Sequence, residues 1–350
     1  MIHSDNLTIT KALKELNLAK YKCLILTDKN KIFSGTLTDG DLRRAILKGA
    51  KFKDKIKKYI FKNSFFLRTS NLTNININKI FNNKNNDILA IPILDNQNKV
   101  VKVIFPDIKS TKFHKKKINN TVVIVAGGKG QRLEPFTSIL PKPLAPIDNK
   151  TLLEQIMLNF KNYNMNNFLI SINYKKEIIK AYFKDNNEFK ISFIEEKNPT
   201  GTAGSLKFLK NKVSNDFLLT NCDIMADVNY HHLIDFHKKN KFDFTIIVSK
   251  RNFKIPYGVC EVDKNAMLKR LIEKPNYDYF VNIGLYVIKR DVLKFLPKKN
   301  HLDMNEFIDI LSKKNKRVGI YPISDKGWLD TGQWNEYKAA SEKFKELFNK

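Results

Sequence analysis

Three glycines and two cations lie close together in the middle of this 350-residue chain. The glycines occur within residues 127–130, directly after an apolar, β-branched run at 122–125, and Arg132 and Lys142 follow them. Glycine lacks a Cβ, so its backbone can approach a ligand closely, and consecutive amide groups form an anion-binding cradle. These residues predict a phosphate-binding loop with two nearby cations.

The loop matches neither of the common phosphate signatures. The P-loop pattern G-x-x-x-x-G-K-[ST] does not occur in the sequence, and Leu133 stands where the dinucleotide fingerprint G-x-G-x-x-G has its third glycine. The alternative is a tight turn that needs glycine for its backbone conformation alone.

Strand-like and helix-like segments alternate around this loop. They lie at 122–125, 152–157, 168–172, 178–183, 191–194 and 217–220. This alternation predicts an α/β fold with a doubly wound, mostly parallel sheet. Ligands of such sheets bind at the carboxyl ends of the strands, which is where the glycine loop begins.

The stretch AGGKGQRLEPFT, followed by PKPL, resembles the sugar-nucleotide pyrophosphorylases. These nucleotidyltransferases join a nucleoside triphosphate to a sugar 1-phosphate. The resemblance implies a Rossmann-like nucleotidyltransferase domain at 121–350. It also implies that the nucleotide is held by Ala126, Gly127, Gly128 and Gly130.

A second segment resembles the family's Leu-Gly-Thr-Ala-Gly motif, which lies against nucleotide and sugar. Gly201 and Thr202 match its nucleotide-binding part and Gly204 its sugar-binding part, while Thr200 replaces the leucine. The resemblance assigns four further residues to the sugar, namely Glu273, Lys274, Asn282 and Gly284.

Two aspartates match the family's metal ligands. Asp223 follows an apolar strand, with Cys222 in place of the usual glycine, and Asp330 lies in a Trp-x-Asp-x-Gly segment. Both would bind Mg²⁺, a hard cation suited to carboxylate and phosphate oxygens. We expect a loop after Asp223, and the alternative for this residue is that it caps a helix.

The family's reaction is attack by a sugar 1-phosphate oxygen on the α-phosphorus of the triphosphate, with release of pyrophosphate. Catalysis then consists of positioning and charge neutralisation. The resemblance implies that Arg132 neutralises the α-phosphate and the pyrophosphate, and that Lys142 holds the sugar phosphate. No histidine is required, and the i, i+5 spacing of His232 and His237 does not suit a shared metal ion.

The base is inferred from an acidic pair before the Gly-Thr segment. In this family the residue five positions before the Gly-Thr pair faces the base, and here that residue is Glu196, beside Glu195. A carboxylate accepts two hydrogen bonds, and guanine offers two adjacent donors, so Glu196 favours GTP. The alternative is that Glu196 is a solvated acid at the end of a strand.

The first 115 residues contain two similar segments. A helix at 7–17, strands at 23–26 and 32–37 and a helix start at 38–46 are followed by a fainter copy at 75–105. An offset of 66 places Asp107 where Asp41 lies.

These segments resemble a pair of CBS motifs. Gly35, Thr38 and Asp41 match a Gly-x-x-Thr-x-x-Asp pattern that holds the ribose of an adenine nucleotide, whereas Val101 and Ile104 replace the glycine and threonine in the second copy. We therefore expect a small α/β CBS-pair domain at 1–115, regulatory or dimerising, and a homodimer. The alternative is that Thr38 and Asp41 cap a helix. Residues 110–120 read as a polar linker.

The amino-acid composition limits which other classes of protein this chain could belong to. The net charge of +28 raises nucleic acid as a partner, but lysine is spread along the chain and only eight arginines occur, which indicates no specific nucleic-acid site. There is no run of 18 apolar residues and no apolar signal core at the start, and the three cysteines are scattered. We expect a cytoplasmic protein that does not enter membranes.

The layout as a whole resembles the guanylyltransferases that act on glucosamine 1-phosphate in bacterial legionaminic acid synthesis. It implies the formation of GDP-glucosamine from GTP and α-D-glucosamine 1-phosphate. The alternatives are guanylyl or uridylyl transfer to another sugar 1-phosphate, such as mannose or heptose, and nucleotide sensing without catalysis. The retention of Arg132, Lys142, Asp223 and Asp330 together disfavours a pure sensor.

Overall fold

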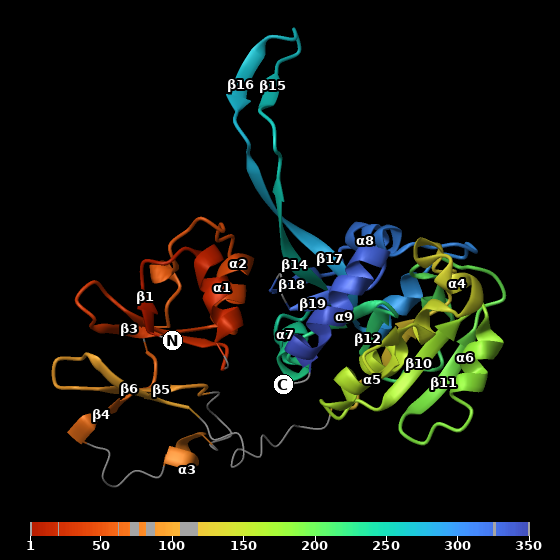
Figure 1. Ribbon diagram of the computed structural model, residues 1–350, viewed down its shortest axis with the longest axis horizontal. Coiled ribbons are helices and arrows are strands. Elements are labelled where there is room, and N and C mark those ends of the chain that lie inside the picture. The colour runs from red at the N-terminus through yellow and green to blue at the C-terminus, as the bar shows by residue number, and fades with distance from the viewer. Residues whose placement is uncertain are drawn as a thin grey trace. The chain divides into compact units, whose positions relative to one another are not determined.

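The computed structural model describes residues 2–19, 21–61, 63–70, 77–81, 88–105, 118–324 and 327–348. The chain forms two compact units, Met1–His114 and Lys115–Lys350 (Figure 1). Residues 110–117 of the expected linker at 110–120 lie outside the described residues, and so does Asp107, the expected counterpart of Asp41.

The second unit is built on a seven-stranded sheet. Its strands, in spatial order, are β11 (Lys190–Glu195), β10 (Asn167–Ile172), β7 (Val122–Val125), β12 (Phe217–Asn221), β17 (Asn276–Ile288), β14 (Phe244–Lys254) and β18 (Val318–Ile323). All of them are parallel except β17, which is antiparallel to both neighbours. The expected α/β class with a mostly parallel sheet is confirmed.

Each central strand sends alternate side chains into two separate cores. In β7, Val122 and Ile124 belong to one apolar cluster and Val123 to the other. The first cluster includes residues of α5 (Leu152–Lys161), α6 (Lys176–Tyr182), α7 (Tyr230–Lys239) and α9 (Trp334–Phe348). The second includes residues of η5 (Gly204–Phe208), η6 (Arg290–Phe295) and α8 (Met304–Lys313). A strand covered on both faces must be apolar throughout, which explains the continuous β-branched run of β7.

Helix α5 begins where the sequence predicts it. Thr151 is the N-cap, and its side chain accepts from the amide of Glu154, whose carboxylate accepts from the Thr151 amide at 2.8 Å. This reciprocal capping satisfies two donors that the first helical turn leaves unpaired.

A two-stranded ribbon extends from one end of this sheet. The pairing of β14 with β17 continues to Lys254 and Asn276, and β15 (Val259–Val262) then pairs with β16 (Leu268–Ile272). Figure 1 shows β15 and β16 well clear of the sheet and its helices. We call residues 255–275 the arm.

The first unit contains two three-stranded sheets of the same topology. One consists of β1 (Ile2–Ser4), β2 (Cys23–Thr27) and β3 (Phe33–Thr38), and the other of β4 (Leu67–Arg68), β5 (Ile91–Leu94) and β6 (Val100–Ile104). In each sheet the first two strands are parallel and the third is antiparallel. The helices of this unit among its described residues include α1 (Ile9–Leu18), α2 (Asp39–Leu47), η1 (Ile56–Lys58) and α3 (Ile77–Phe81).

The two hairpins of this unit correspond in detail. Asp28 Oδ1 accepts from the amides two and four residues further on, and Asp95 Oδ1 does the same. Pairing of Leu26 with Gly35 corresponds to pairing of Ile93 with Lys102, which gives an offset of 67. The expected offset of 66 is therefore wrong by one residue in the described strands, because the strand pairing aligns Gly35 with Lys102 rather than with Val101.

Candidate active site

The glycine loop leaves the carboxyl end of β7 and enters η3 (Gln131–Leu133). Gly130 has a φ of 69°, and a Cβ there would lie 3.0 Å from Thr137 Cγ2 and 3.1 Å from Lys142 Cβ. Gly128 is exposed, and among the described residues no heavy atom lies within 4 Å of the place where its Cβ would be. The tight-turn alternative accounts for Gly130 but not for Gly128, whose open surroundings suit the close approach of a ligand.

Lys142 and Asp223 form the first contact of the site. Lys142 lies in η4 (Lys142–Leu144), is 7% exposed, and donates through Nζ to Asp223 Oδ2. Asp223 follows the carboxyl end of β12, two residues past its last residue, Asn221. Because β12 pairs directly with β7, the end of β12 lies beside the glycine loop.

Asp330 and Arg132 converge on the same point from other parts of the chain. A Cβ placed on Gly332 would lie 2.8 Å from Asp330 Oδ1, 3.5 Å from Asp223 Oδ2 and 3.7 Å from Arg132 Nη2. The absence of a side chain at Gly332 keeps this point open. Two carboxylates and a guanidinium thus surround one small volume, and Lys142 contacts one of the carboxylates.

A short antiparallel pair holds the two aspartates together. β13 (Ile224–Ala226) pairs with β19 (Trp328–Asp330), with Ile224 opposite Asp330. The expected loop after Asp223 is therefore a strand, since residues 224–226 find a partner more than 100 residues further along. The helix-capping alternative for Asp223 is wrong, because a strand rather than a helix follows it.

The two aspartates fit a divalent cation. Within the described part of the chain, Asp223 Oδ1 is buried without a hydrogen-bond partner, and Asp330 Oδ1 accepts from the amide of Gly332 at 2.7 Å. No group of three or more His, Cys, Asp or Glu side chains with metal-binding geometry occurs among the described residues. Two carboxylates suit Mg²⁺, which usually keeps several waters and binds substrate phosphates.

Sequence reasoning missed Glu336 and Arg251. Burial and the negative charge of Asp330 raise the pKa of Glu336, and the positive charges of Arg251 and Arg132 oppose this shift. Glu336 Oε2 is buried and, among the residues described, has no hydrogen-bond partner. Local sequence carries no signal for this carboxylate, because it reaches the site only when α9 packs beside β19.

Glu196 is buried rather than solvated. It is 5% exposed, lies one residue beyond β11, and is close to Gly127, whose Cβ would be 3.7 Å from Glu196 Oε1. Ser171 donates to Oε1, and Thr200 donates to Oε2 at 2.5 Å. The alternative of a solvated strand-end acid is wrong, and each carboxylate oxygen retains capacity for a further donor.

Backbone conformation and packing explain why the Gly-Thr segment at 200–204 has these residue types. Gly201 has a φ of 86°, and a Cβ there would lie 2.5 Å from Leu302 O. Thr202 Oγ1 accepts from the amide of Met304 at 2.9 Å, and the Thr202 amide donates to Asp303 Oδ1 at 3.1 Å. A Cβ on Gly204 would lie 2.2 Å from Thr200 Oγ1. These contacts join the segment to the start of α8, and the nucleotide and sugar contacts of its residues stay predictions.

Two of the expected sugar-binding residues lie near the aspartates. Gly284 has a φ of 82°, and its Cβ would lie 2.7 Å from Asn221 Nδ2, at the end of β12. Asn282 is exposed and accepts through Oδ1 from the amide of Gly284 at 2.9 Å. The structure therefore brings Asn282, Gly284 and Asn221 together.

Glu273 and Lys274 lie elsewhere, on the arm. Their side chains are 70% and 61% exposed and contact each other at 3.8 Å. The resemblance assigned these two residues and Asn282 to one sugar site, whereas in this structure they lie on the arm and Asn282 lies in β17.

Thr38 and Asp41 form the expected cap of α2. The Asp41 carboxylate accepts from the amide and hydroxyl of Thr38 at 2.8 and 2.7 Å, and Thr38 Oγ1 accepts from the Asp41 amide. The capping alternative is thus confirmed, and nucleotide binding by these residues stays a prediction.

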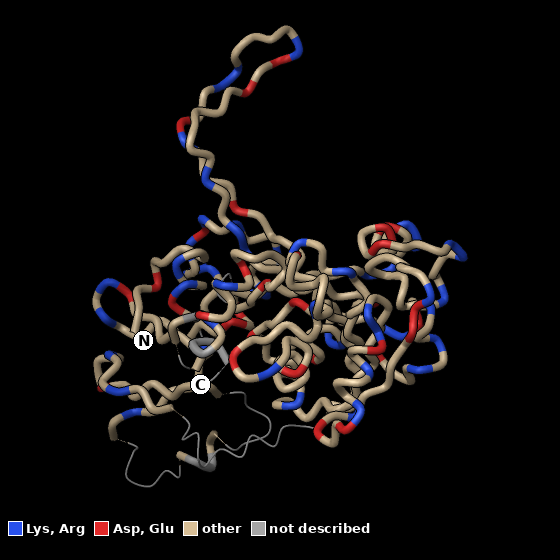
Figure 2. Tube along the Cα trace, turned by 45° about the vertical axis from the view of Figure 1, so that its right-hand side comes forward, with Lys and Arg blue, Asp and Glu red and all other residues tan. Residues whose placement is uncertain are grey.

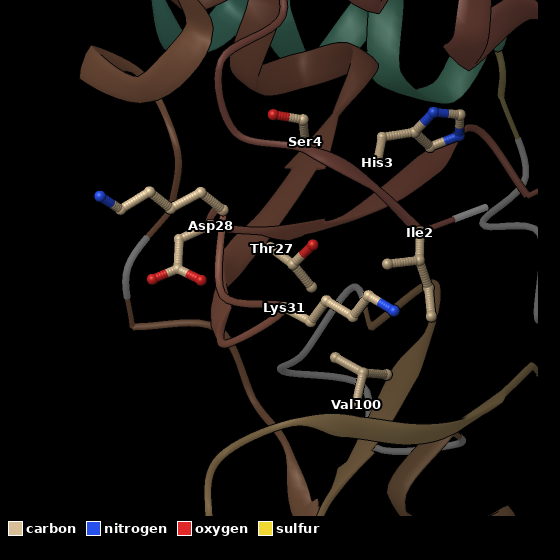
Figure 3. A pocket seen from close by; sticks show the side chains of 8 residues that line it. Ile2, His3, Ser4, Thr27, Asp28, Lys31 and Val100 are labelled. Atoms are coloured by element: carbon tan, nitrogen blue, oxygen red, sulfur yellow. The ribbon is translucent and has the colours of Figure 1, made fainter.

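The first unit also contains a pocket at the opposite end of its strands (Figure 3). It has a volume of about 450 Å³ and is lined by Ile2, His3, Ser4, Thr27, Asp28, Lys29, Lys31 and Val100. Thr38 pairs with Cys23, at the other end of β2 from Thr27. The pocket is therefore distinct from the expected ribose site.

The family model for nucleotidyl transferases matches residues 121–346, and the chain belongs to this family. The match covers the sheet, the glycine loop and all four converging charged residues.

Several relatives are guanylyltransferases by name. The D-glycero-alpha-D-manno-heptose 1-phosphate guanylyltransferase of Campylobacter jejuni is 30% identical over 61% of this chain and 96% of its own. The probable mannose-1-phosphate guanylyltransferase 1 of Oryza sativa is 29% identical over 61% of this chain and 62% of its own. The chain therefore spans about three fifths of the length of that relative.

Solved structures agree with the fold. The crystal structure of HddC from Yersinia pseudotuberculosis has a TM-score of 0.51 and 26% identity, and it covers 64% of this chain and 99% of its own. A second structure of that protein is a complex with GMP-PN. Across the described residues of the present chain, no helix is both long and apolar enough to cross a membrane.

Proposed function

We propose that this protein transfers GMP from GTP to a sugar 1-phosphate and releases pyrophosphate. The observation that carries the proposal is the convergence of Arg132, Lys142, Asp223 and Asp330 beside the glycine loop. Guanylyltransferases among the relatives support GTP as the donor.

The residues would act by positioning and by charge neutralisation. Amides of the glycine loop would bind the triphosphate, and Arg132, which is exposed, would neutralise the α-phosphate and the departing pyrophosphate. Lys142 would hold the sugar phosphate as its oxygen attacks the α-phosphorus and the bond to pyrophosphate breaks. Asp223 and Asp330 would hold Mg²⁺, which supplies charge stabilisation at the phosphates when bound.

Base selection would depend on Glu196. Its two hydrogen bonds from Ser171 and Thr200 fix the orientation of the carboxylate before a ligand arrives. A preoriented acceptor suits the two adjacent donors of guanine, while uracil and thymine present one donor between acceptors.

For the acceptor, we propose α-D-glucosamine 1-phosphate, giving GDP-glucosamine for legionaminic acid or another surface glycan. The names of the relatives favour mannose 1-phosphate or a heptose 1-phosphate as the second candidates. The choice of the amino sugar rests on the layout of the whole chain, since Glu273, which could accept from an ammonium group, lies on the arm rather than beside Asn282.

We further propose that the first unit is a CBS pair in a cytoplasmic homodimer. Ile32 forms a bridge with Lys99, its equivalent at the offset of 67, as expected for two copies related by a local two-fold axis. An adenine nucleotide is the ligand we propose for Thr38 and Asp41.

Two other functions, nucleotide sensing without catalysis and polyanion binding, have less support. A sensor without catalysis does not require the four converging charged groups. A polyanion-binding protein needs a basic surface, but in Figure 2 lysine and arginine are interspersed with acids along the described trace.

The test is pyrophosphate release with GTP, UTP, dTTP and ATP against glucosamine, mannose and heptose 1-phosphates. We expect turnover with GTP and glucosamine 1-phosphate to be the fastest, and to be lost with EDTA and restored by Mg²⁺. Preference for UTP or dTTP would refute the base assignment, and no release with any pair would refute the reaction class.

A further inference from the structure

The pocket in the first unit lies beside the hairpin of β2 and β3, and this hairpin has an equivalent in the hairpin of β5 and β6. Thr27 pairs with Phe33 directly after a register shift, and Leu94 pairs with Val100 directly after the same shift. At the offset of 67, Val100 is therefore the equivalent of Phe33. The surroundings of the pocket thus have a counterpart beside the second hairpin.

The first strands of the two sheets supply the other equivalent positions. Ser4 of β1 pairs with Thr27, and Arg68 of β4 pairs with Leu94, which is the equivalent of Thr27. The first strands are therefore related by an offset of 64, and Ser4 is the equivalent of Arg68. Because Ser4 lines the pocket, a short side chain lies where the second copy has a long one.

Aromatic side chains occupy the counterpart of the pocket beside the second hairpin. Phe66 packs against Phe33 with ring centroids 6.1 Å apart, and the guanidinium carbon of Arg68 lies 5.8 Å from the centroid of Phe66. In the first copy, Ile2 is the equivalent of Phe66 and Val100 that of Phe33, and both line the pocket. Smaller side chains at these positions explain why a volume of about 450 Å³ is open there.

Arg68 also makes polar contacts that the first copy leaves unmade. It donates to Asp95 O at 3.0 Å and to Asn98 Oδ1 at 2.9 Å, at the turn of the second hairpin. Ser4 is too short for such a bridge, and its hydroxyl accepts from the amide two residues further on. Among the described residues, Asp28 O accepts only from the amide three residues further on, at 3.1 Å. A carbonyl oxygen has two lone pairs, so Asp28 O can accept a further hydrogen bond.

A lysine replaces an asparagine at the turn of the first hairpin. Lys31 is the equivalent of Asn98, and the two residues have positive φ values of 62° and 60°. Within the described part of the chain, Lys31 Nζ has no hydrogen-bond or ion-pair partner. Figure 3 shows its side chain extending between Thr27 and Val100 toward Ile2. The second copy thus presents an acceptor at this position, and the first copy presents a charged donor.

The lining of the pocket has an excess of positive charge at neutral pH. Lys29 and Lys31 are its cations, and Asp28 is its only acid. Asp28 Oδ1 already accepts from the amides two and four residues further on. Burial lowers the pKa of His3, so this ring is neutral at pH 7. An anionic group is therefore the charge that suits the pocket.

We propose that this pocket binds a small molecule that has a planar ring, an N–H donor and one anionic group. The ring lies between Ile2 and Val100, where the second copy has its own aromatic side chains, and the anion pairs with Lys31. The N–H group donates to Asp28 O, as the guanidinium of the second copy does at its own turn. The volume of about 450 Å³ lies within the range of about 300–1,000 Å³ that is usual for small-molecule sites.

Calorimetric titration of the full-length protein tests the site without turnover, so the result does not depend on the proposed function. The probes are para-aminobenzoate, for aromatic carboxylates, and CMP, for mononucleotides, since both have the ring, the N–H donor and the anion. The filled variant, Ile2→Phe with Ser4→Arg and Val100→Phe, introduces the residues of the second copy. We expect at least one probe to bind the wild type and its Kd to rise by about tenfold or more in the filled variant.

Each probe that behaves in this way identifies a class of ligand for the pocket. Absence of binding by both probes would overturn the proposal, and so would an equal Kd in the wild type and the filled variant. Circular dichroism checks that the filled variant is folded.

Lys31→Asn tests the charge separately and does not depend on filling the pocket. Asparagine occurs at the equivalent turn position with a similar φ, so the fold should be retained. Loss of the charged donor should raise the Kd of the bound probe by about tenfold. Lys14→Asn, which removes an exposed lysine of α1, is the matched control and should leave the Kd unchanged. A Kd that Lys31→Asn does not change would overturn the proposal.

Discussion

Thr331 donates both its amide and its hydroxyl to the carbonyl oxygen of Asp223, each at 3.0 Å. These bonds connect residues 108 positions apart and place Asp330, the neighbour of Thr331, beside Asp223. The proximity of the two aspartates therefore depends on the docking of β19 against β13.

Arg132→Ala should lower kcat by about a hundredfold or more, because it removes a charge that stabilises the transition state. The side chain is exposed, so the fold should not change. Steady-state pyrophosphate release measures the effect. Lys190→Ala, at the amino end of β11, is the control and should be near normal. Near-normal turnover of the Arg132 variant would remove this residue from the mechanism.

Asp223→Asn should raise the Mg²⁺ concentration needed for half-maximal activity by about tenfold or more, because a neutral amide is a weaker ligand for a hard cation. A Mg²⁺ titration at saturating substrates measures it. Asp216→Asn, just before the start of β12, should leave the titration unchanged. An unchanged requirement in the Asp223 variant would show that the metal is held elsewhere.

Glu196→Gln should reduce discrimination for GTP over UTP by about 1–3 kcal/mol, since one guanine donor would face a donor. The ratio of kcat/KM values for the two nucleotides measures it. Glu195→Gln is a matched control, because Glu195 is exposed and paired with Lys176 and Lys180. Equal selectivity in both variants would refute the role of Glu196.

His237 should make stability fall in mild acid. Burial lowers its pKa from 6.5 to about 4, so below about pH 6.5 the unfolded chain binds a proton that the folded chain does not accept until about pH 4. The free energy of unfolding should therefore fall by up to about 3 kcal/mol over this range. Urea unfolding followed by tryptophan fluorescence reports on this unit, because Trp328 and Trp334 both lie in it.

The control for this titration is His237→Gln, which cannot bind the proton. His237 Nδ1 is 2.7 Å from Thr245 Oγ1, and glutamine retains a polar group for that hydroxyl. The variant should lose most of the slope between pH 6.5 and 4. An equal slope in both proteins would assign the acid sensitivity to other groups.

Removal of residues 1–115 should leave a soluble, active enzyme with kcat within several-fold of the full-length value. The second unit has its own apolar clusters on both faces of its sheet, and these consist of residues from 118 onward. Pyrophosphate release and size-exclusion chromatography measure activity and solubility. Aggregation of the shortened chain would show that the second unit needs the first.

The sequence by itself determined the class of sheet and predicted the four charged residues that the structure brings together. Alternating apolar and amphipathic segments specify a doubly wound sheet because both faces of its strands must be covered. Arg132 and Lys142 follow the glycine loop closely in sequence, and Asp223 and Asp330 were found through the resemblance of their short motifs to those of the nucleotidyltransferases.

Tertiary structure decided the partners of these residues. The contact of Lys142 with Asp223, the approach of Glu336 to Asp330, and the separation of Glu273 from Asn282 depend on strand register and on the docking of distant segments. Burial of Glu196 likewise depends on the neighbouring strand that supplies Ser171. Side chains that meet across 25 to 108 positions are brought together by packing, and no local periodicity encodes which of them meet.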